Sequence, residues 1–193
     1  MHIYFYDAYR GNRTTALNTE QLISLAINRY VSDGNLLLPT NQTEFTLCRT
    51  SKGKPYLDGF SGNISVSHSD NLWVCSIGAR QNGIDIQNMK HSNFEAISKR
   101  FFQLDEQEAV RQGGIQSFMS IWCRKEAFIK YHGLTIGDTI DWLNVAKDGC
   151  PLDQMEYLGQ QIYFSEIQVA PEYLCVVATS TKETIWVRNL QVE

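Results

Sequence analysis

The chain runs twice through one order of secondary-structure patterns, and this repeat limits the folds that it can form. Residues 1–82 show a strand pattern, an amphipathic helix pattern at 19–32, and strand patterns that end at residue 78. Residues 83–193 again show a strand, helices and then strands, which we place at 83–87, 94–101, 105–112, 117–131, 140–145, 161–168 and 173–179.

We therefore predict an α/β (α+β) fold that is a pseudo-two-fold duplication of one α/β unit. We expect mainly antiparallel three-stranded sheets, with the active site at the seam between the halves. Residues 1–82 would form the amino-terminal half and residues 83–193 the carboxy-terminal half of one compact, pseudo-dimeric unit. If both halves lie in one chain, the cleft is complete and a monomer suffices.

Composition narrows the class of protein. With 43% hydrophobic and 20% charged residues over 193 positions, the chain has the balance of a folded globular protein. No apolar run approaches the roughly 20 residues of a membrane span, and the amino terminus shows no basic leader. The five cysteines are an odd number without a CxxC pair, so we expect reduced thiols in a cytoplasmic protein without a membrane partner.

Charge is distributed unevenly along the sequence. The formal net charge of −4 argues against a nucleic-acid partner. Residues 1–54 nevertheless carry six basic and four acidic side chains, a net charge of +2. This excess is either chance or a set of cations for a small anionic ligand.

The segment Gly83–Gln87 (GIDIQ) places an acid within an apolar strand. Strand alternation directs Ile84 and Ile86 to one face and Asp85 and Gln87 to the other. A carboxylate at the edge of an apolar layer needs a cation or hydrogen-bond donors to compensate its charge. Asp85 therefore either caps the next segment or binds a metal ion.

The segment Trp122–Lys130 (WCRKEAFIK) carries a stripe of functional side chains on a helix. Trp122, Glu126 and Lys130 follow at i, i+4 and i+8, and therefore share one face. A Glu–Lys pair at this spacing is often exposed and contributes only about 0.3–0.5 kcal/mol. The strongly apolar flanks instead favour a buried helix whose charged residues meet a polar cluster.

The segment Ser65–Ser69 (SVSHS) combines hydroxyls with an imidazole. Alternation puts Ser65, Ser67 and Ser69 on one face and His68 on the other. His68 is either hydrogen-bonded in place at a strand end or, with Ser67, turned toward an anion.

Taken together, these segments resemble one family. NISVSHS, GIDIQ, FFQLDEQEA and WCRKEAFIK, in this order, are similar to segments of the 4′-phosphopantetheinyl transferases of the longer, Sfp-type branch, and the turn Gly53–Pro55 also matches. The resemblance runs from about residue 12 to residue 130. It implies transfer of the phosphopantetheine arm of coenzyme A to a serine of an apo acyl or peptidyl carrier protein. Adenosine 3′,5′-bisphosphate is released, Mg²⁺ is required, and the fold has two similar halves.

The resemblance also implies roles for single residues. Asp85 and Glu126 would be magnesium ligands, and Gln87 lies where many members have a Glu that belongs to the metal shell. The base that takes the serine proton would be Glu126, Glu106 or a metal-bound water, and Glu106 would alternatively be an extra metal contact. The remaining residues would contact the coenzyme: Lys125 and Lys130 its pyrophosphate, Ser67, His68 and Lys54 its 3′-phosphate and adjoining phosphates, and Arg13 and Thr14 its adenine end.

Two departures from the family pattern keep alternatives open. Few residues precede Arg13, where longer relatives carry a basic stretch, and Gln87 replaces an acid. The alternatives are a coenzyme- or carrier-binding module that has lost turnover, and a Mg²⁺-dependent phosphodiesterase that acts on coenzyme-like diphosphates.

Overall fold

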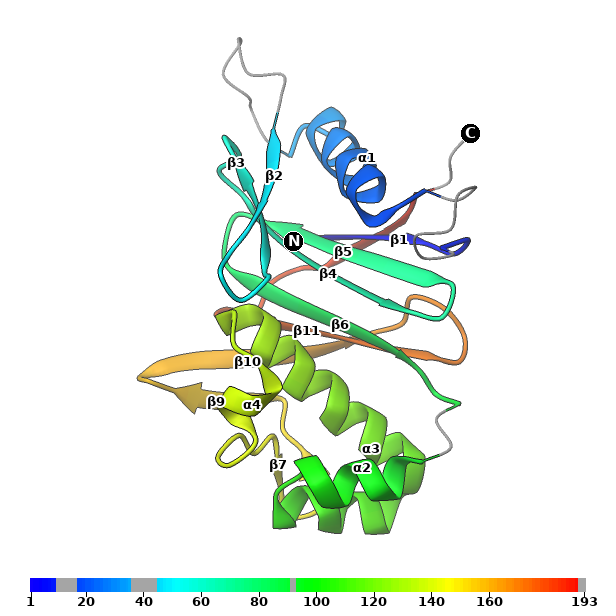
Figure 1. Ribbon diagram of the computed structural model, residues 1–193, viewed down its shortest axis with the longest axis vertical. Coiled ribbons are helices and arrows are strands. Elements are labelled where there is room, and N and C mark those ends of the chain that lie inside the picture. Colours follow the sequence, from blue (N-terminus) through cyan, green and yellow to red (C-terminus); the bar gives the residue numbers. More distant parts are fainter. Residues whose placement is uncertain (10–16, 36–44, 91–92, 191–193) are drawn as a thin grey trace.

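The computed structural model describes residues 1–9, 17–35, 45–90 and 93–190 and has a mixed α+β fold with two four-stranded sheets (Figure 1). The elements are β1 (His2–Tyr6), α1 (Thr19–Ser32), β2 (Thr46–Arg49), β3 (Pro55–Asp58), β4 (Asn63–Ser69), β5 (Leu72–Gly78), β6 (Asn82–Asn88), α2 (Phe94–Phe101), α3 (Leu104–His132), α4 (Ile136–Thr139), β7 (Ala146–Lys147), β8 (Cys150–Pro151), β9 (Gln154–Tyr157), β10 (Gln160–Ile167), β11 (Tyr173–Thr179) and β12 (Trp186–Asn189).

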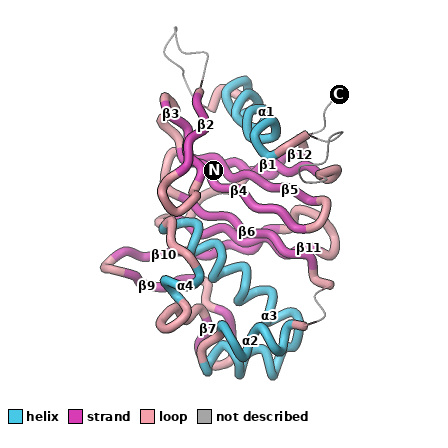
Figure 2. The backbone as a smooth tube through the Cα atoms, in the orientation of Figure 1, coloured by secondary structure: helices cyan, strands magenta, loops and turns pink. Residues whose placement is uncertain are grey.

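The first sheet has the strand order β12-β1-β5-β4, and α1 covers one of its faces (Figures 1 and 2). The predicted bounds of β1, α1 and β5 are confirmed. Asn18 caps α1, because its side chain accepts a hydrogen bond from the backbone N–H of Gln21, whose side chain accepts from Asn18 in return. The apolar stripe of α1 packs on Tyr4 and Trp73 and consists of Leu22, Ile23, Ala26, Ile27 and Tyr30.

The second sheet has the strand order β6-β11-β10-β9 and packs against α3. The two helices that the sequence predicts at 105–112 and 117–131 form one element, which is interrupted where Gly114 takes a left-handed φ of 59°. Glycine adopts this conformation without the steric penalty of a Cβ atom. The helix after this break, which carries the WCRKEAFIK segment, is therefore the one that lies across β6.

The two sheets meet edge to edge where β4 lies beside β6. Alternate serine hydroxyls of β4 accept hydrogen bonds from alternate backbone N–H groups of β6, in place of the usual backbone ladder. The bonds join Ile84 N to Ser65 Oγ (3.1 Å), Ile86 N to Ser67 Oγ (3.4 Å) and Asn88 N to Ser69 Oγ (3.0 Å). The predicted common face of the three serines is confirmed, and its function in the fold is to join the sheets.

A shared apolar core lies between the two sheets, next to this seam. Ile3 and Val74 from the first sheet contact the region of Ile84 and Val177 from the second, and all four are fully buried. Ile84 and Ile86 therefore face this core, as strand alternation predicts. Asp85, on the opposite face of β6, is directed toward α3.

Two sequence predictions about the sheets are wrong. Residues 140–145 form no strand, because Thr135 and Asp138 cap the short helix α4, and the N–H of Ile140 then bonds back to Ile136. Leu143 and Val145 are buried there without strand pairing. Each main sheet has four strands and not three, because β12 and β9 add outer strands that we did not predict.

The internal duplication and the division at residues 82 and 83 stay predictions. β12, from the end of the chain, pairs with β1 in the first sheet and so crosses that division. None of the helices in the described part of the chain combines the length and hydropathy that a transmembrane span requires.

Candidate active site

Gly83 determines how closely α3 approaches β6. A Cβ atom at this position would collide with the carbonyl oxygen of Ala127 and with the backbone of Tyr131. The missing side chain therefore lets the helix backbone rest directly on the strand. This contact fixes the register between β6 and α3, and with it the distance from Asp85 to the side chains of Glu126 and Lys130.

We expect Gly83→Ala to lower the free energy of unfolding by about 1–3 kcal/mol, the range typical of overpacking. The variant should also weaken the contact between Asp85 and Lys130, because α3 must move outward. Urea denaturation measures the first effect. Gly78→Ala is the matched control, since its Cβ would meet only the Met1 and Asn82 side chains at ordinary contact distances, the nearest at 3.5 Å. Equal stability of both variants would contradict the role of Gly83.

Asp85 is the centre of a buried polar cluster. Asp85 is 2% exposed. Oδ1 accepts hydrogen bonds from Ser67 Oγ (2.7 Å) and Lys130 Nζ (2.7 Å), and Oδ2 accepts from Gln87 Nε2 (3.0 Å). Lys130 Nζ also lies 2.8 Å from Ser67 Oγ. The structure thus brings together four of the residues that the sequence assigned to the site.

Glu126 lies one helical turn before Lys130, on the same face of α3. Burial raises the pKa of Glu126, the negative charge of Asp85 raises it further, and the positive charge of Lys130 opposes both effects. The two carboxyl groups, one on β6 and one on α3, therefore interact. Two acids with one lysine between them leave a deficit of positive charge at this point.

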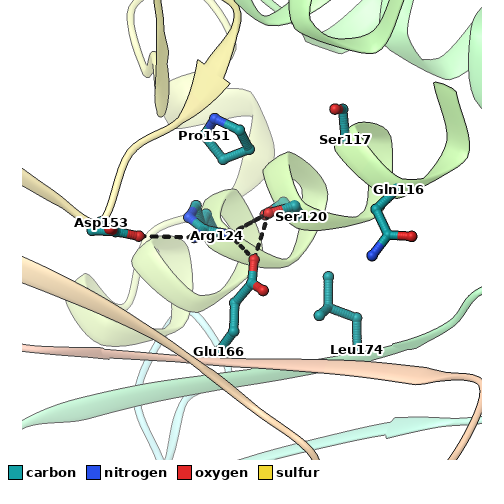
Figure 3. Close-up of a pocket in the computed structure, with 8 residues that line it drawn as sticks. All are labelled: Gln116, Ser117, Ser120, Arg124, Pro151, Asp153, Glu166 and Leu174. Carbon is teal, nitrogen blue, oxygen red and sulfur yellow. Dashed lines mark hydrogen bonds and ion pairs between the residues drawn. The ribbon is translucent and has the colours of Figure 1, made fainter. Parts of the chain in front are cut away.

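The other charged residues of the WCRKEAFIK segment, Arg124 and Lys125, bind partners other than Asp85. Figure 3 shows Arg124 in a separate hollow of about 410 Å³, where α3 faces β8 and β10. Its guanidinium lies 2.6 Å from Glu166 Oε1 and 3.4 Å from Asp153 Oδ1, and it also donates to the Ser120 hydroxyl. Arg124 ties the helix to two neighbouring segments and does not reach Asp85.

Lys125 and Glu106 form a buried ion pair with a distance of 2.8 Å from Nζ to Oε2. Glu106 also accepts from the N–H of Gln103 (2.7 Å) and from the N–H of Val145 (2.8 Å), and Lys125 also donates to the Leu143 carbonyl. Burial lowers the pKa of Lys125, and Glu106 opposes this shift. The structure therefore places both residues together in the helix packing, apart from the contacts of Asp85; their predicted roles toward metal and pyrophosphate stay predictions.

Lys54 connects the Gly53–Pro55 turn to α3 and β6. Its Nζ donates to the carbonyl oxygens of Tyr131 (2.8 Å) and Asn82 (3.4 Å), at the end of α3 and the start of β6. Burial lowers the pKa of Lys54 to about 8. A nearby anion would favour its charged form.

A hollow of about 230 Å³ opens between this turn and the end of α3. The cations Arg49, Lys52, Lys54 and Lys130 line it, and the described residues around it include no Asp or Glu. Lys52 also forms an ion pair with Asp138 (2.8 Å). Three of these cations belong to the basic excess of residues 1–54, which supports its interpretation as an anion site.

A second hollow of about 490 Å³ shares Arg49 with the first and is also lined by Tyr9, Glu20 and His68. His68 is exposed, and its ring centre lies 5.0 Å from that of Tyr9. Arg49 and Lys52 are the site cations that the motifs did not identify, although the charge count included them. Arg13 and Thr14 lie outside the described residues.

The donor set fits a magnesium ion. Within the described residues no group of three or more His, Cys, Asp or Glu side chains is placed to hold a metal. Mg²⁺ needs less, since one or two carboxylates with waters and substrate phosphate complete its shell. Asp85 and Glu126 supply two interacting carboxylates, and the structure gives Glu126 no hydrogen bond or ion pair from a described residue that would occupy it.

Comparison with known proteins identifies relatives of this chain. Residues 81–177, half of the chain, match the family described as the 4′-phosphopantetheinyl transferase superfamily. The 4′-phosphopantetheinyl transferase gsp of Aneurinibacillus migulanus is 30% identical over 131 residues, which cover 66% of this chain and 49% of the relative. Sfp of Bacillus subtilis (strain 168) is 27% identical over 135 residues, which cover 66% and 60%. The 4′-phosphopantetheinyl transferase psf-1 of Bacillus pumilus is 33% identical over 119 residues, which cover 58% of this chain and 49% of the relative.

The chain spans about half the length of the curated relatives that it matches. The matched family region contains β6 with Asp85 and the whole of α3 with Glu126 and Lys130. The resemblance to the Sfp-type branch is thereby confirmed, and the chain belongs to the 4′-phosphopantetheinyl transferase superfamily.

Proposed function

We propose that this chain transfers the 4′-phosphopantetheine arm of coenzyme A to a serine hydroxyl of an apo acyl or peptidyl carrier protein. Adenosine 3′,5′-bisphosphate is the second product. The observation that carries the proposal is the convergence of Asp85, Glu126 and Lys130 beside a hollow lined by four cations. Cleavage of a diphosphate requires acidic residues that bind a divalent ion and, next to them, cations that bind the phosphates.

The chemistry is attack of the serine oxygen on the β-phosphate of the coenzyme, with the α-phosphate and its nucleoside as leaving group. The diphosphate must be neutralised and the nucleophile held in line. Asp85 and Glu126 would hold a Mg²⁺ ion, which would supply charge stabilisation for the phosphoryl oxygens. Lys130 and Lys54 bind the phosphates from the side of the hollow, and Arg49 and His68 extend the contact toward the coenzyme's remaining phosphate.

Three groups are candidates to accept the serine proton. Glu126 is the best placed of the carboxylates, because it lies in the site, close enough to Asp85 and Lys130 to interact with both. Glu106 is engaged by Lys125 and two backbone N–H groups. A water of the metal shell is the third candidate.

Gln87 should lower the affinity for Mg²⁺ relative to an acid at the same position. Its amide Nε2 now donates to Asp85 Oδ2, at 3.0 Å. We expect Gln87→Glu to bring a third negative charge to this point and to lower the Mg²⁺ concentration that gives half-maximal transfer by about tenfold, or 1.4 kcal/mol. A metal titration of transfer measures this. An unchanged requirement would exclude Gln87 from the metal shell.

Mass spectrometry of the carrier tests the function. The protein is incubated with coenzyme A, Mg²⁺ and an apo carrier protein, and we expect the carrier to gain the mass of one phosphopantetheine arm. The matched control is a carrier whose acceptor serine is replaced by alanine, which should stay unmodified. Cleavage of the coenzyme with an unmodified carrier would indicate a phosphodiesterase instead. Coenzyme binding without any product would indicate a binding module.

A further inference from the structure

Lys130 contacts Oδ1 of Asp85, one of the two carboxylate oxygens that a divalent ion could use. Oδ1 accepts from Lys130 and from Ser67, and Oδ2 accepts from the Gln87 amide. Both oxygens of this buried carboxylate are therefore engaged by donors of the chain itself. Among the residues that the structure describes, Lys130 is the cation that forms an ion pair with Asp85.

Two cations cannot occupy this position together. Lys130 Nζ lies 2.7 Å from Oδ1, whereas Mg²⁺ binds carboxylate oxygens at about 2.0–2.1 Å. An ammonium group and a divalent ion on one oxygen would repel each other strongly in a buried site. If Lys130 leaves without replacement, Asp85 keeps an uncompensated buried charge, which is costly. Replacement of the Lys130 ammonium group by a divalent ion on Asp85 is therefore favourable only when Lys130 gains a new partner.

The hollow provides the place for that partner. Lys130 lines it together with Arg49, Lys52 and Lys54. A lysine has a flexible four-carbon stem and a compact charge, so its ammonium group can turn from Asp85 to a phosphate in the hollow.

We propose that Lys130 holds the place of the divalent ion on Asp85 until the coenzyme's diphosphate draws it away, so that coenzyme and metal bind cooperatively. This inference rests on the proposed function, because it takes the diphosphate and the divalent ion from it. By linkage, the factor by which the coenzyme strengthens metal binding equals the factor by which the metal strengthens coenzyme binding. The coenzyme-free protein is then a weak metal binder by construction.

Direct binding of Mn²⁺ as the probe, followed by electron paramagnetic resonance, tests the inference without turnover. Mn²⁺ is titrated into the full chain with and without coenzyme A, in the absence of carrier protein. The variants are Lys130→Met and, as a matched loss of one cation from the same hollow, Lys54→Met. Lys54 donates to two carbonyl oxygens and not to Asp85, so its loss removes charge but no competitor.

We expect Lys130→Met to bind Mn²⁺ about tenfold more tightly than the parent when coenzyme is absent. With coenzyme A bound, the two proteins should differ far less, so the coupling factor shrinks. Lys54→Met should leave coenzyme-free Mn²⁺ affinity near the parental value. Equal or weaker Mn²⁺ binding by coenzyme-free Lys130→Met would overturn the inference, as would an equal gain in Lys54→Met.

Thermal denaturation provides a second readout. Without Lys130 the buried Asp85 lacks its ion-pair partner, so Lys130→Met should melt at a lower temperature than the parent, and Mn²⁺ alone should restore much of the loss. A variant that Mn²⁺ does not stabilise more than it stabilises the parent would contradict the inference. Failure here with normal transfer by the parent refutes only this inference, whereas absence of transfer by the parent refutes the proposed function.

Discussion

Replacement of Asp85 by Asn is expected to reduce transfer of the phosphopantetheine arm by about three orders of magnitude or more. Loss of a metal ligand removes several kcal/mol of charge stabilisation, and each 1.36 kcal/mol corresponds to a factor of ten in rate. Asn keeps the shape of Asp85 and can still accept hydrogen bonds from Ser67 and Lys130, so the fold should survive. The gain in carrier mass over time measures the rate.

Circular dichroism should show that the variant is folded, and Asp141→Asn, at an exposed position, is the matched control with unchanged transfer. Glu126→Gln should give a loss of similar size, because both carboxylates belong to the same proposed ligand set. Transfer at near-parental rate in either variant would refute the metal site. If only one of the two variants lost transfer activity, then only that carboxylate would be a metal ligand, and the proposed pair of ligands would be wrong.

Breaking the buried pair of Lys125 and Glu106 should be the most destabilising single change. In Lys125→Met, Glu106 stays at 0% side-chain exposure without its cationic partner and with only two backbone N–H groups as described partners. Removal of one partner of a buried ion pair costs about 3–5 kcal/mol. We therefore expect a loss of that size in the free energy of unfolding, measured by urea denaturation.

The double variant Lys125→Met/Glu106→Gln separates this role from a contact to the coenzyme. It should recover part of the lost stability, because no unpaired charge remains, and the double-mutant cycle gives the coupling energy of the pair. If Lys125 instead faces the pyrophosphate, Lys125→Met will raise the KM for coenzyme A and leave the unfolding free energy near the parental value.

Local geometry explains why much of the fold could be predicted. The helix bounds at 19–32 and the strand bounds at 2–6 and 72–78 follow from apolar periodicity and capping residues, which act over a few positions. The strand that we predicted at 140–145 does not form. Its apolar pattern records burial, and both a strand and a turn with buried residues give that pattern.

The candidate site likewise has features that follow from local geometry and features that do not. Strand and helix geometry act locally, so the sequence was enough to predict that Asp85 faces away from Ile84 and Ile86, and that Glu126 and Lys130 share a helix face. Which charged neighbour meets which partner depends on the packing of distant elements, which the sequence does not reveal. Arg124, Lys125 and Lys130 project in different directions around one helix, so each meets the element that packs there: Glu166, Glu106 and Asp85, respectively.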